Sequence, residues 1–278
     1  MAILSIQSAV AHGYVGNAAA VPALQALGHE VWRVDTVAFS NHPGHGRFTG
    51  GVRPASEIAS LIDGIDALGV MGECETVLSG YLGEAATADA IAKAVQATRR
   101  ARPDARYVLD PVIGDDGRVF VRDGVLEAIR DTLLPMADIV LPNPSELGWL
   151  AGVEARGMPG ILDTARRLLE RGPSLVVVTG VEEAGEMAAY AVTRDAVWRA
   201  AATRRGRRFN GTGDLFAAVF TGWITRSNAL DQALAAAVAA LDLVTGETER
   251  RGTQELALIP VLADLARTGE HASATRIE

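Results

Sequence analysis

The chain has 278 residues, of which 49% are hydrophobic and 22% are charged, and its formal net charge is −8. This composition excludes an intrinsically disordered chain, and the single cysteine, Cys74, excludes a disulfide scaffold. The acidic balance argues against a nucleic-acid partner, because phosphate contacts need an excess of Lys and Arg. The only lysine, Lys93, lies in a helical pattern with no glycine before it, so neither a Walker-A loop nor a lysine Schiff base is expected.

No segment has the length expected of a membrane span. The longest apolar stretches, such as ALAAAVAALDLV, fall short of the roughly 20 residues that cross a bilayer. The first residues, MAILSIQSAVAHG, have no basic stretch and no cleavage site of a secretory signal, and are typical of a buried strand. We therefore expect a cytoplasmic protein without membrane contact, which also suits an unpaired thiol.

The first half of the chain predicts alternating strands and helices. A strand is expected at residues 2–7, and helical spacing over 17–27 stops at Gly28, a usual helix terminator. A polar, glycine-rich loop at 40–51 follows a second strand at 31–39. Further along, the pattern predicts helices at 56–68, 87–100 and 123–133, and strands at 76–79 and 107–109.

The second half continues this alternation and then changes. Strands are expected at 138–141 and 175–179, with a helix at 161–170 between them, and residues 187–193 and 196–202 predict an antiparallel pair. Three helices are expected to begin near Thr212, Asn228 and Thr253. The chain therefore predicts one α/β domain over residues 1–278, with a mainly parallel central sheet, helices on both faces and antiparallel strands near its C-terminal end.

Polar residues follow the predicted strands at the carboxyl edge of the sheet, where α/β proteins bind their ligands. They are Ser8, Ser40 to His45, Ser79 to Tyr81, Asp110, Asn143, Glu146, Thr179 and Gly180. This edge is the predicted functional site.

The most informative segment is residues 210–218, NGTGDLFAA, in which Gly211 and Gly213 flank Thr212 before an alanine-rich helix. Unpaired N–H groups at a helix start bind anions, and glycines let the backbone approach a phosphate closely. Asp214 would be repelled by that phosphate, so its presence favours a general base that deprotonates an attacking hydroxyl. The alternative is a capping aspartate after a tight turn.

Two acids at neighbouring strand ends support a phosphate-transfer site. Asp110 opens the turn DPVIGD, and Glu146 follows PNPS one strand–helix unit later. Two such carboxylates suit a Mg²⁺ ion held partly through water. The alternatives are turn initiation for Asp110 and a first-turn helix acid for Glu146.

Eight segments occur in the order found in one enzyme family: SIQS at 5–8, GYVGN at 13–17, FSNH at 39–42, SGYLG at 79–83, DPVIGD at 110–115, PN at 142–143 with Glu146, GTGDLF at 211–216 and ATRI at 274–277. Through them the chain resembles the ribokinase superfamily, and within it the pyridoxal (pyridoxine/pyridoxamine) kinases. The Gly-x-Gly-Asp element is shared across the superfamily, whereas SIQS, GYVGN, FSNH and SGYLG are more specific to the vitamin B6 branch.

The resemblance implies a ribokinase-like fold and ATP-dependent phosphorylation of the 5′-hydroxymethyl group of pyridoxal and related B6 vitamers, giving pyridoxal 5′-phosphate and ADP. It also implies Mg²⁺ with ATP as co-substrate, admits a monovalent cation, and suggests a homodimer. The sequence itself fixes neither the preferred vitamer nor an interface.

By the same resemblance, Asp214 matches the catalytic base, and Gly211, Thr212 and Gly213 match the anion hole over the transferring phosphate. The positions matching ATP-side residues are Asp110, Asp115, Asn143, Glu146, Thr179 and the 211–213 loop, with Asp110 and Glu146 also matching metal-side acids. The positions matching substrate-binding residues are Ser8, Val15, His42, Tyr81 and Asp214.

Four residues depart from the family pattern. Pro43 stands where many members have Thr, Phe120 where some have Tyr, Leu141 where a small or hydroxyl residue is usual, and Thr179 where some bacterial members have Lys. These departures leave phosphoryl transfer as the expected reaction, but they leave ring preference and nucleotide affinity open.

Two further segments allow more than one interpretation. The glycine-rich loop that begins at His42 predicts a flap that excludes water from the site, in preference to a zinc site. The arginine run at 199–208 either reaches ATP phosphates with one or two side chains or forms a solvated strand and loop.

Two other functions stay open at this point: a kinase for hydroxymethylpyrimidine or a sugar, and a non-catalytic B6-binding protein. The SIQS and FSNH segments favour a B6 substrate over the first alternative. A complete set of acids and glycines argues against the second, because binding alone needs no base.

Overall fold

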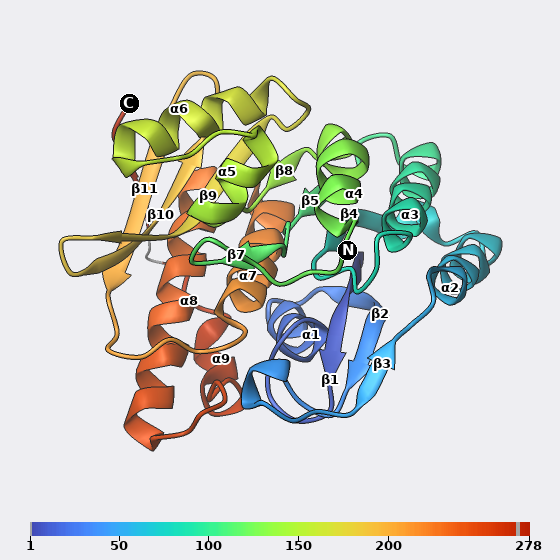
Figure 1. The fold of residues 1–278 in the computed structure, drawn as a ribbon, viewed down its shortest axis with the longest axis horizontal. Coiled ribbons are helices and arrows are strands. Elements are labelled where there is room, and N and C mark those ends of the chain that lie inside the picture. Colours follow the sequence, from blue (N-terminus) through green and yellow to red (C-terminus); the bar gives the residue numbers. More distant parts are fainter. Residues whose placement is uncertain (1, 271–272) are drawn as a thin grey trace.

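The computed structural model describes residues 2–270 and 273–278, and its centre is a ten-stranded sheet in the order β12-β11-β10-β9-β8-β5-β4-β1-β2-β3 (Figure 1). The strands of this sheet are β1 (Ala2–Val10), β2 (Glu30–Phe39), β3 (Gly50–Val52), β4 (Cys74–Ser79), β5 (Arg106–Leu109), β8 (Ile139–Val140), β9 (Leu175–Glu183), β10 (Glu186–Val192), β11 (Val197–Thr203) and β12 (Thr275–Arg276). A separate hairpin joins β6 (Gly114–Asp115) to β7 (Arg118–Val119).

The strand directions confirm the predicted mainly parallel sheet. The six adjacent strands β2, β1, β4, β5, β8 and β9 run parallel to one another. Strands β10, β11 and β12 continue the sheet in antiparallel register, as expected for the C-terminal part, and β3 pairs antiparallel with β2 at the other edge. The chain winds outward from β1 in both directions, so the switch in strand order lies between β1 and β4, where α/β sheets open a crevice.

Helices cover both faces of the sheet, as predicted (Figure 1). One face packs against α2 (Ala55–Ala67), α3 (Thr87–Ala101), α4 (Val125–Ala128), α5 (Pro144–Ala151) and α6 (Gly157–Leu169). The other packs against α1 (Asn17–Ala26), α7 (Thr212–Ser227), α8 (Leu230–Arg251) and α9 (Leu262–Leu265).

The core is aliphatic because both faces of the central strands are covered. In β1, Ile3 points into the layer with α1 and α7, while Leu4 and Ile6 join the layer with α2 and α3. A parallel strand buried on both faces is apolar throughout, which explains the run AILSI at the start of the chain. Alanines fill the tight contacts between α7 and α8, so few aromatic side chains are needed.

Surface ion pairs join neighbouring helices outside this core. Lys93 on α3 donates to the Asp63 carboxylate on α2 at 2.8 Å, and both side chains are about half exposed. Exposed pairs of this kind contribute at most about 1 kcal/mol each to stability. The only lysine of the sequence is therefore a surface residue on the helical layer.

Most predicted elements are confirmed, and the differences have physical reasons. The helix expected near Thr253 is absent there, because residues 253–258 run as a connection that buries Leu256 and Leu258 before a 3₁₀ turn at Ile259–Val261 and α9. The first strand extends to Val10 because it pairs with β2 up to Phe39. The short elements α5, β3, β6, β7 and β12 gave no periodic signal of their own.

No helix in the described parts of the chain is long and apolar enough to cross a membrane.

Candidate active site

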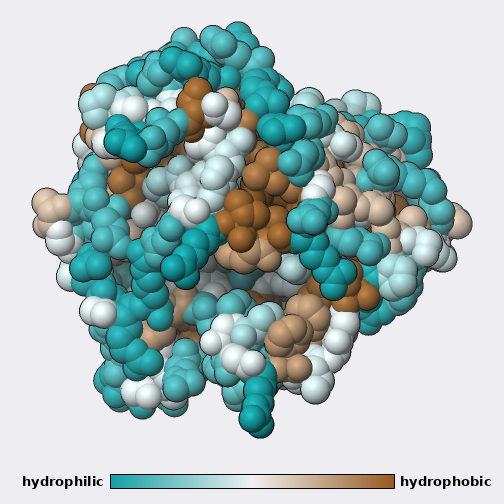
Figure 2. All heavy atoms as spheres, in the orientation of Figure 1, coloured by the Kyte–Doolittle hydropathy of each residue, from teal (hydrophilic) through white to brown (hydrophobic). Residues whose placement is uncertain are grey.

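The carboxyl ends of the parallel strands and the start of α7 lie at one edge of the sheet, near the centre of Figure 1. Figure 2 shows a hydrophobic patch near the middle of the same face, beside β7 and α4, with hydrophilic residues around it. Val119 and Phe120 are the strongly exposed large apolar residues of that part of the chain. The edge thus combines polar strand ends with an apolar wall, as a site for a flat heterocycle requires.

The glycine loop before α7 forms the predicted cradle. Gly211 has φ +86° and precedes Thr212, the first residue of the helix, and no side chain caps this helix start. Thr212 instead turns its hydroxyl back to donate to the Phe209 carbonyl at 3.3 Å. Apart from the Asp214 N–H, which bonds its own carboxylate, the first N–H groups of α7 meet no side-chain acceptor within the described residues and are available to an anion.

This cradle packs directly on the connection between β1 and α1. A Cβ atom at Gly211 would lie 1.8 Å from the Tyr14 carbonyl oxygen, which only a glycine with its positive φ avoids. Val15, predicted at the substrate, contacts the same glycine and is buried. Residues about 200 positions apart thus share one wall of the site.

Asp214 lies in the first turn of α7 and faces this connection. Burial raises the pKa of its carboxyl, while backbone N–H groups of Gly16 and of Asp214 itself donate toward it and lower that pKa in part. Desolvation makes a carboxylate a stronger proton acceptor than one in water, and the two backbone donors offset only part of this effect while they fix its orientation. The geometry therefore suits the predicted general base.

A buried polar network fixes the start of α1, which the sequence reasoning had not assigned a role. Asn17 is fully buried, accepts a hydrogen bond from Ser5 at 2.7 Å, and donates to Asp35 at 2.8 Å and to the Val34 carbonyl at 3.1 Å. These bonds hold the residue next to Gly16, and so position the N–H that faces Asp214. The GYVGN motif was a signal for this residue, although its partners lie on other strands.

Asp110 lies beyond β5 and is almost fully buried. Burial raises its pKa well above the usual range, and the negative charges of Glu146 and Asp214 raise it further. The structure therefore brings together the three acids that the sequence placed at separate strand ends. Gathering three negative charges in one buried place is unfavourable unless a cation or a proton joins them.

Glu146 also caps the start of α5. One of its carboxylate oxygens accepts from the N–H groups of Ile113 and Gly114 at 2.9 and 3.4 Å, and the other accepts from the Asn143 N–H at 2.9 Å. Burial raises its pKa to about 8, although these three donors lower it. Both oxygens are thus engaged by the backbone, whereas among the described residues no backbone N–H donates to the Asp110 carboxylate.

Asn143 completes the same capping box. Its side-chain oxygen accepts from the Glu146 N–H at 2.9 Å, and its amide donates to the Gly114 carbonyl at 2.8 Å. The side chain is therefore committed to holding the turn after β5 against α5. Any contact with a nucleotide made by Asn143 would be added to this structural role.

The two remaining ATP-side residues lie at the rim. Asp115, in the β6–β7 hairpin, is exposed and accepts from Arg208 at 3.3 Å, while the same guanidinium binds Asp116 and Glu182. Thr179, in β9, is partly buried and its N–H donates to the Pro142 carbonyl at 2.9 Å. Asp115 is thus outside the buried acid cluster, although its charge contributes to raising the pKa of Glu146.

The predicted substrate-side residues come from three connections. Ser8 is partly exposed near the end of β1, and a Cβ at Gly16 would lie 2.3 Å from its hydroxyl oxygen. Tyr81 follows β4, is partly buried, and burial raises the pKa of its phenol. His42 accepts from the Gly44 N–H at 3.1 Å and caps the 3₁₀ turn Pro43–His45, and burial lowers its pKa.

The predicted flap begins with this turn and ends in β3. Gly44 approaches Asn210, since a Cβ at Gly44 would lie 3.6 Å from the Asn210 amide nitrogen. The turn therefore sits next to the glycine cradle. Pro43, which departs from the family pattern, is exposed and is the first residue of this turn.

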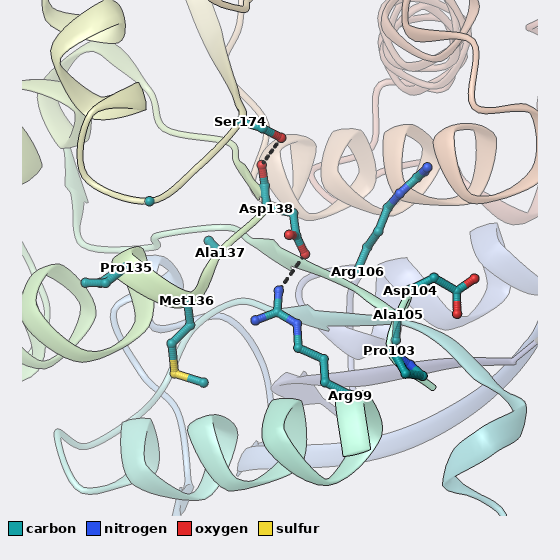
Figure 3. Close-up of a pocket in the computed structure, with 11 residues that line it drawn as sticks. Arg99, Pro103, Asp104, Ala105, Arg106, Pro135, Met136, Ala137, Asp138 and Ser174 are labelled. Carbon is teal, nitrogen blue, oxygen red and sulfur yellow. Dashed lines mark hydrogen bonds and ion pairs between the residues drawn. The ribbon is translucent and has the colours of Figure 1, made fainter. Parts of the chain in front are cut away.

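A hollow of about 460 Å³ lies at the opposite edge of the sheet (Figure 3). Arg106 and Asp138 stand at the amino ends of β5 and β8, and Arg99 donates to Asp138 at 2.7 Å. None of the predicted site residues lines this hollow. Ligand sites of open α/β sheets form at the other edge, so this hollow is not our candidate.

Comparison with known proteins agrees with this geometry. A sequence model of the phosphomethylpyrimidine kinase family matches residues 59–253. A pyridoxal kinase PdxY of Rubrobacter xylanophilus is 43% identical over 263 residues, covering 92% of this chain and 91% of the relative, and one of Deinococcus radiodurans is 42% identical over 99% and 96%. The chain belongs to the pyridoxal kinase family.

A solved structure of this family has the same fold. The pyridoxal kinase from Leishmania donovani in complex with ADP and pyridoxamine has a TM-score of 0.92 and 30% identity, covering 100% of this chain and 99% of the other. A putative phosphomethylpyrimidine kinase from Bacteroides thetaiotaomicron has a TM-score of 0.91 and 25% identity, covering 99% and 97%. The ribokinase-like fold expected for a pyridoxal kinase is therefore confirmed.

The acid cluster of this pyridoxal kinase family member fits a Mg²⁺ ion. Its donors are carboxylate oxygens, which hard cations prefer, and the Asp110 carboxylate accepts no hydrogen bond within the described residues. In the part of the chain that the structure describes, no three acidic, His or Cys side chains are arranged to hold a metal directly. An ion here would therefore rest on Asp110, on water and on substrate phosphate, with Glu146 behind it.

Proposed function

We propose that this chain transfers the γ-phosphoryl group of ATP to the 5′-hydroxymethyl group of pyridoxal and related B6 vitamers. The observation that carries the proposal is the placement of Asp214 beside the Gly211–Gly213 cradle and within the field of Asp110. The family membership supports the same reaction, because relatives over nearly the whole chain are named pyridoxal kinases. The products are pyridoxal 5′-phosphate and ADP.

In the proposed reaction, Asp214 accepts the proton of the 5′-hydroxyl as that oxygen attacks the γ-phosphorus. The new oxygen–phosphorus bond forms while the bond from the γ-phosphorus to the bridging oxygen breaks, so ADP leaves with the electron pair. N–H groups of Gly211, Thr212 and Gly213 donate to the oxygens of the moving phosphoryl group. Asp110, together with Glu146, would hold a Mg²⁺ ion, whose charge would offset that of the phosphates.

Other residues are proposed to bind rather than react. Ser8 hydrogen-bonds the edge of the pyridine ring, while Val15, His42 and Tyr81 form the wall on which the ring packs. On the nucleotide side, the proposed contacts are Asn143, Thr179 and Asp115. As parts of the same proposal, residues 1–278 act as one catalytic domain, in a homodimer, in the cytoplasm and without nucleic acid or membrane.

The base assignment is tested by Asp214→Asn. We expect kcat to fall about 10²- to 10⁴-fold, because the amide accepts no proton, while the affinity for ATP is retained. Turnover is measured as pyridoxal 5′-phosphate formation and ATP binding by calorimetry. Asp63→Asn, on the exposed side of α2, serves as the matched control. Near-wild-type turnover of the Asp214 variant would show that another group takes the proton.

One alternative substrate has a specific observation in its favour, because the matching family model describes phosphomethylpyrimidine kinases. A steady-state comparison of pyridoxal, pyridoxamine, pyridoxine and hydroxymethylpyrimidine separates the two. We expect the highest kcat/KM with a B6 vitamer. A clear preference for hydroxymethylpyrimidine would replace the vitamer in the proposal and leave the phosphoryl-transfer chemistry unchanged.

A further inference from the structure

Glu255 contacts two segments that carry predicted substrate-binding residues. It lies in the connection after α8, far from both segments in sequence. Its carboxylate meets Gly13 in the β1–α1 connection and His45 at the end of the 3₁₀ turn. We call these three residues the Glu255 junction.

The junction is closely fitted. The Nε2 atom of His45 lies 2.6 Å from Oε1 of Glu255, and the glutamate side chain is only 14% exposed. A Cβ at Gly13 would lie 2.1 Å from the other carboxylate oxygen, so Glu255 rests against bare backbone with φ +99°. Each carboxylate oxygen thus meets a different segment.

The backbone that carries Glu255 is itself anchored to the core. The side chains of Leu256 and Leu258 are buried in the layer with α1 and α7. The Ala257 N–H donates to the Thr248 hydroxyl of α8 at 2.9 Å, and the Thr253 hydroxyl donates to the Glu255 carbonyl at 2.9 Å. Glu255 is therefore a fixed support rather than a side chain on a free loop.

Each of the two segments that Glu255 contacts also approaches the glycine cradle or Asp214. The turn that ends at His45 begins at His42 and approaches Asn210 beside the cradle. The connection that contains Gly13 continues to Gly16, whose N–H faces Asp214. A shift of either segment would move the ring wall relative to the base.

We propose that Glu255 is a positioning residue. Through its contact with His45 it holds the His42–Gly46 turn next to the β1–α1 connection. It thereby fixes the position of the predicted substrate-binding residues relative to Asp214. Glu255 itself touches no reacting group. The inference rests on the proposed function for its kinetic readout, and it extends that function to a residue that the sequence did not single out.

The kinetic test uses Glu255→Ala, His45→Ala and the double variant. We expect each single change to raise the KM for pyridoxal about tenfold, the effect of losing one charge-assisted hydrogen bond, with the KM for ATP unchanged. The double variant should lose no more than the worse single variant, because both remove one contact. Additive losses, or an equal rise in the KM for ATP, would overturn the proposal.

Two further variants separate positioning from general stability. Glu255→Gln keeps an oxygen that accepts from His45 and should recover most of the loss. Asp63→Ala removes an exposed ion pair of α2 and α3 and should leave both KM values unchanged. A glutamine variant as impaired as the alanine variant would contradict a role through this hydrogen bond.

Hydrogen–deuterium exchange tests the junction without relying on catalysis. In Glu255→Ala we expect faster exchange in both 11–16 and 42–47, with exchange elsewhere unchanged, and no such change in Asp63→Ala. Unchanged exchange in these two segments would overturn the proposal even if the enzyme phosphorylates pyridoxal. Conversely, a wild-type protein that does not phosphorylate pyridoxal would refute the proposed function. The exchange experiment would still show whether Glu255 holds the two segments in place. If Glu255→Ala fails to fold, His45→Ala carries the same measurement.

Discussion

At the scale of single residues, the candidate site is defined by three acidic side chains that the fold buries close to one another. Asp110 is buried within the field of Glu146 and Asp214, and each of these three carboxyls has a raised pKa. Burial is the main cause of all three shifts, and for Asp110 the negative charges of Glu146 and Asp214 add to it. In the proposed reaction, a cation that arrives with the nucleotide would offset this negative charge.

The pH dependence of catalysis follows from these shifts. Asp214 accepts a proton only when ionised, and its raised pKa means that activity falls on the acid side at a higher pH than for an ordinary aspartate. Asp110→Asn removes a neighbouring negative charge, so we expect the acid limb of kcat/KM to move down by on the order of one pH unit, together with a lower kcat. The measurement is a pH–rate profile of both proteins, and an unmoved limb would contradict electrostatic coupling between the two acids.

The sequence predicts these acids well because each follows a strand end, and parallel strands bring their carboxyl ends to one edge. It could not predict the hydrogen bonds that these acids also form with the nearby backbone. The engagement of Glu146 by the N–H groups of Ile113 and Gly114 depends on a turn without periodicity. The contact between Glu255 and His45 joins residues 210 positions apart, for which spacing carries no signal.

At the scale of elements, the short helix α5 illustrates how local chemistry builds the site. Its eight residues are too few for a stable helix in isolation, so the capping box of Asn143 and Glu146 holds its first turn. The same two side chains bind the turn after β5 that follows Asp110. The helix cap and the proposed nucleotide edge thus share one set of hydrogen bonds, so the segment PN with Glu146 has a structural role beside the proposed functional one.

Removal of the cap should separate these effects. In Asn143→Ala, the helix loses its cap and the Gly114 carbonyl loses its donor, so we expect about 1–2 kcal/mol lower stability and a higher KM for ATP. Thermal unfolding and steady-state kinetics provide the two readouts. Asn143→Asp keeps the cap acceptor but not the amide donor to Gly114, so its stability relative to Asn143→Ala shows how much of the loss comes from the cap. A lower melting temperature with an unchanged KM for ATP would limit Asn143 to its structural role.

At the scale of the whole molecule, the two edges of the sheet have different tasks. One edge holds the strand ends, the cradle and the Glu255 junction, whereas the other holds the open hollow around Asp138 (Figure 3). At that second edge Asp138 accepts from Arg99 and from the Tyr107 N–H, both at 2.7 Å. These contacts tie α3 to the starts of β5 and β8, a role in stability rather than in binding.

We therefore expect Arg99→Ala to lower the free energy of unfolding by no more than about 1 kcal/mol, since the pair is partly exposed, and to leave kcat and both KM values unchanged. Chemical denaturation and steady-state kinetics of the same preparation check this. A rise in either KM would show that the second edge communicates with the site.

The position of the single lysine has a chemical consequence for the proposed substrate. Pyridoxal is an aldehyde, and aldehydes condense with primary amines to give imines. Lys93 is paired with Asp63 on the outer helical layer, so no lysine ammonium stands among the side chains at the carboxyl edge. The cations nearest that edge are guanidinium groups such as Arg208, which stay protonated. An aldehyde can therefore enter and leave this cleft without being trapped by condensation with a lysine of its own catalyst.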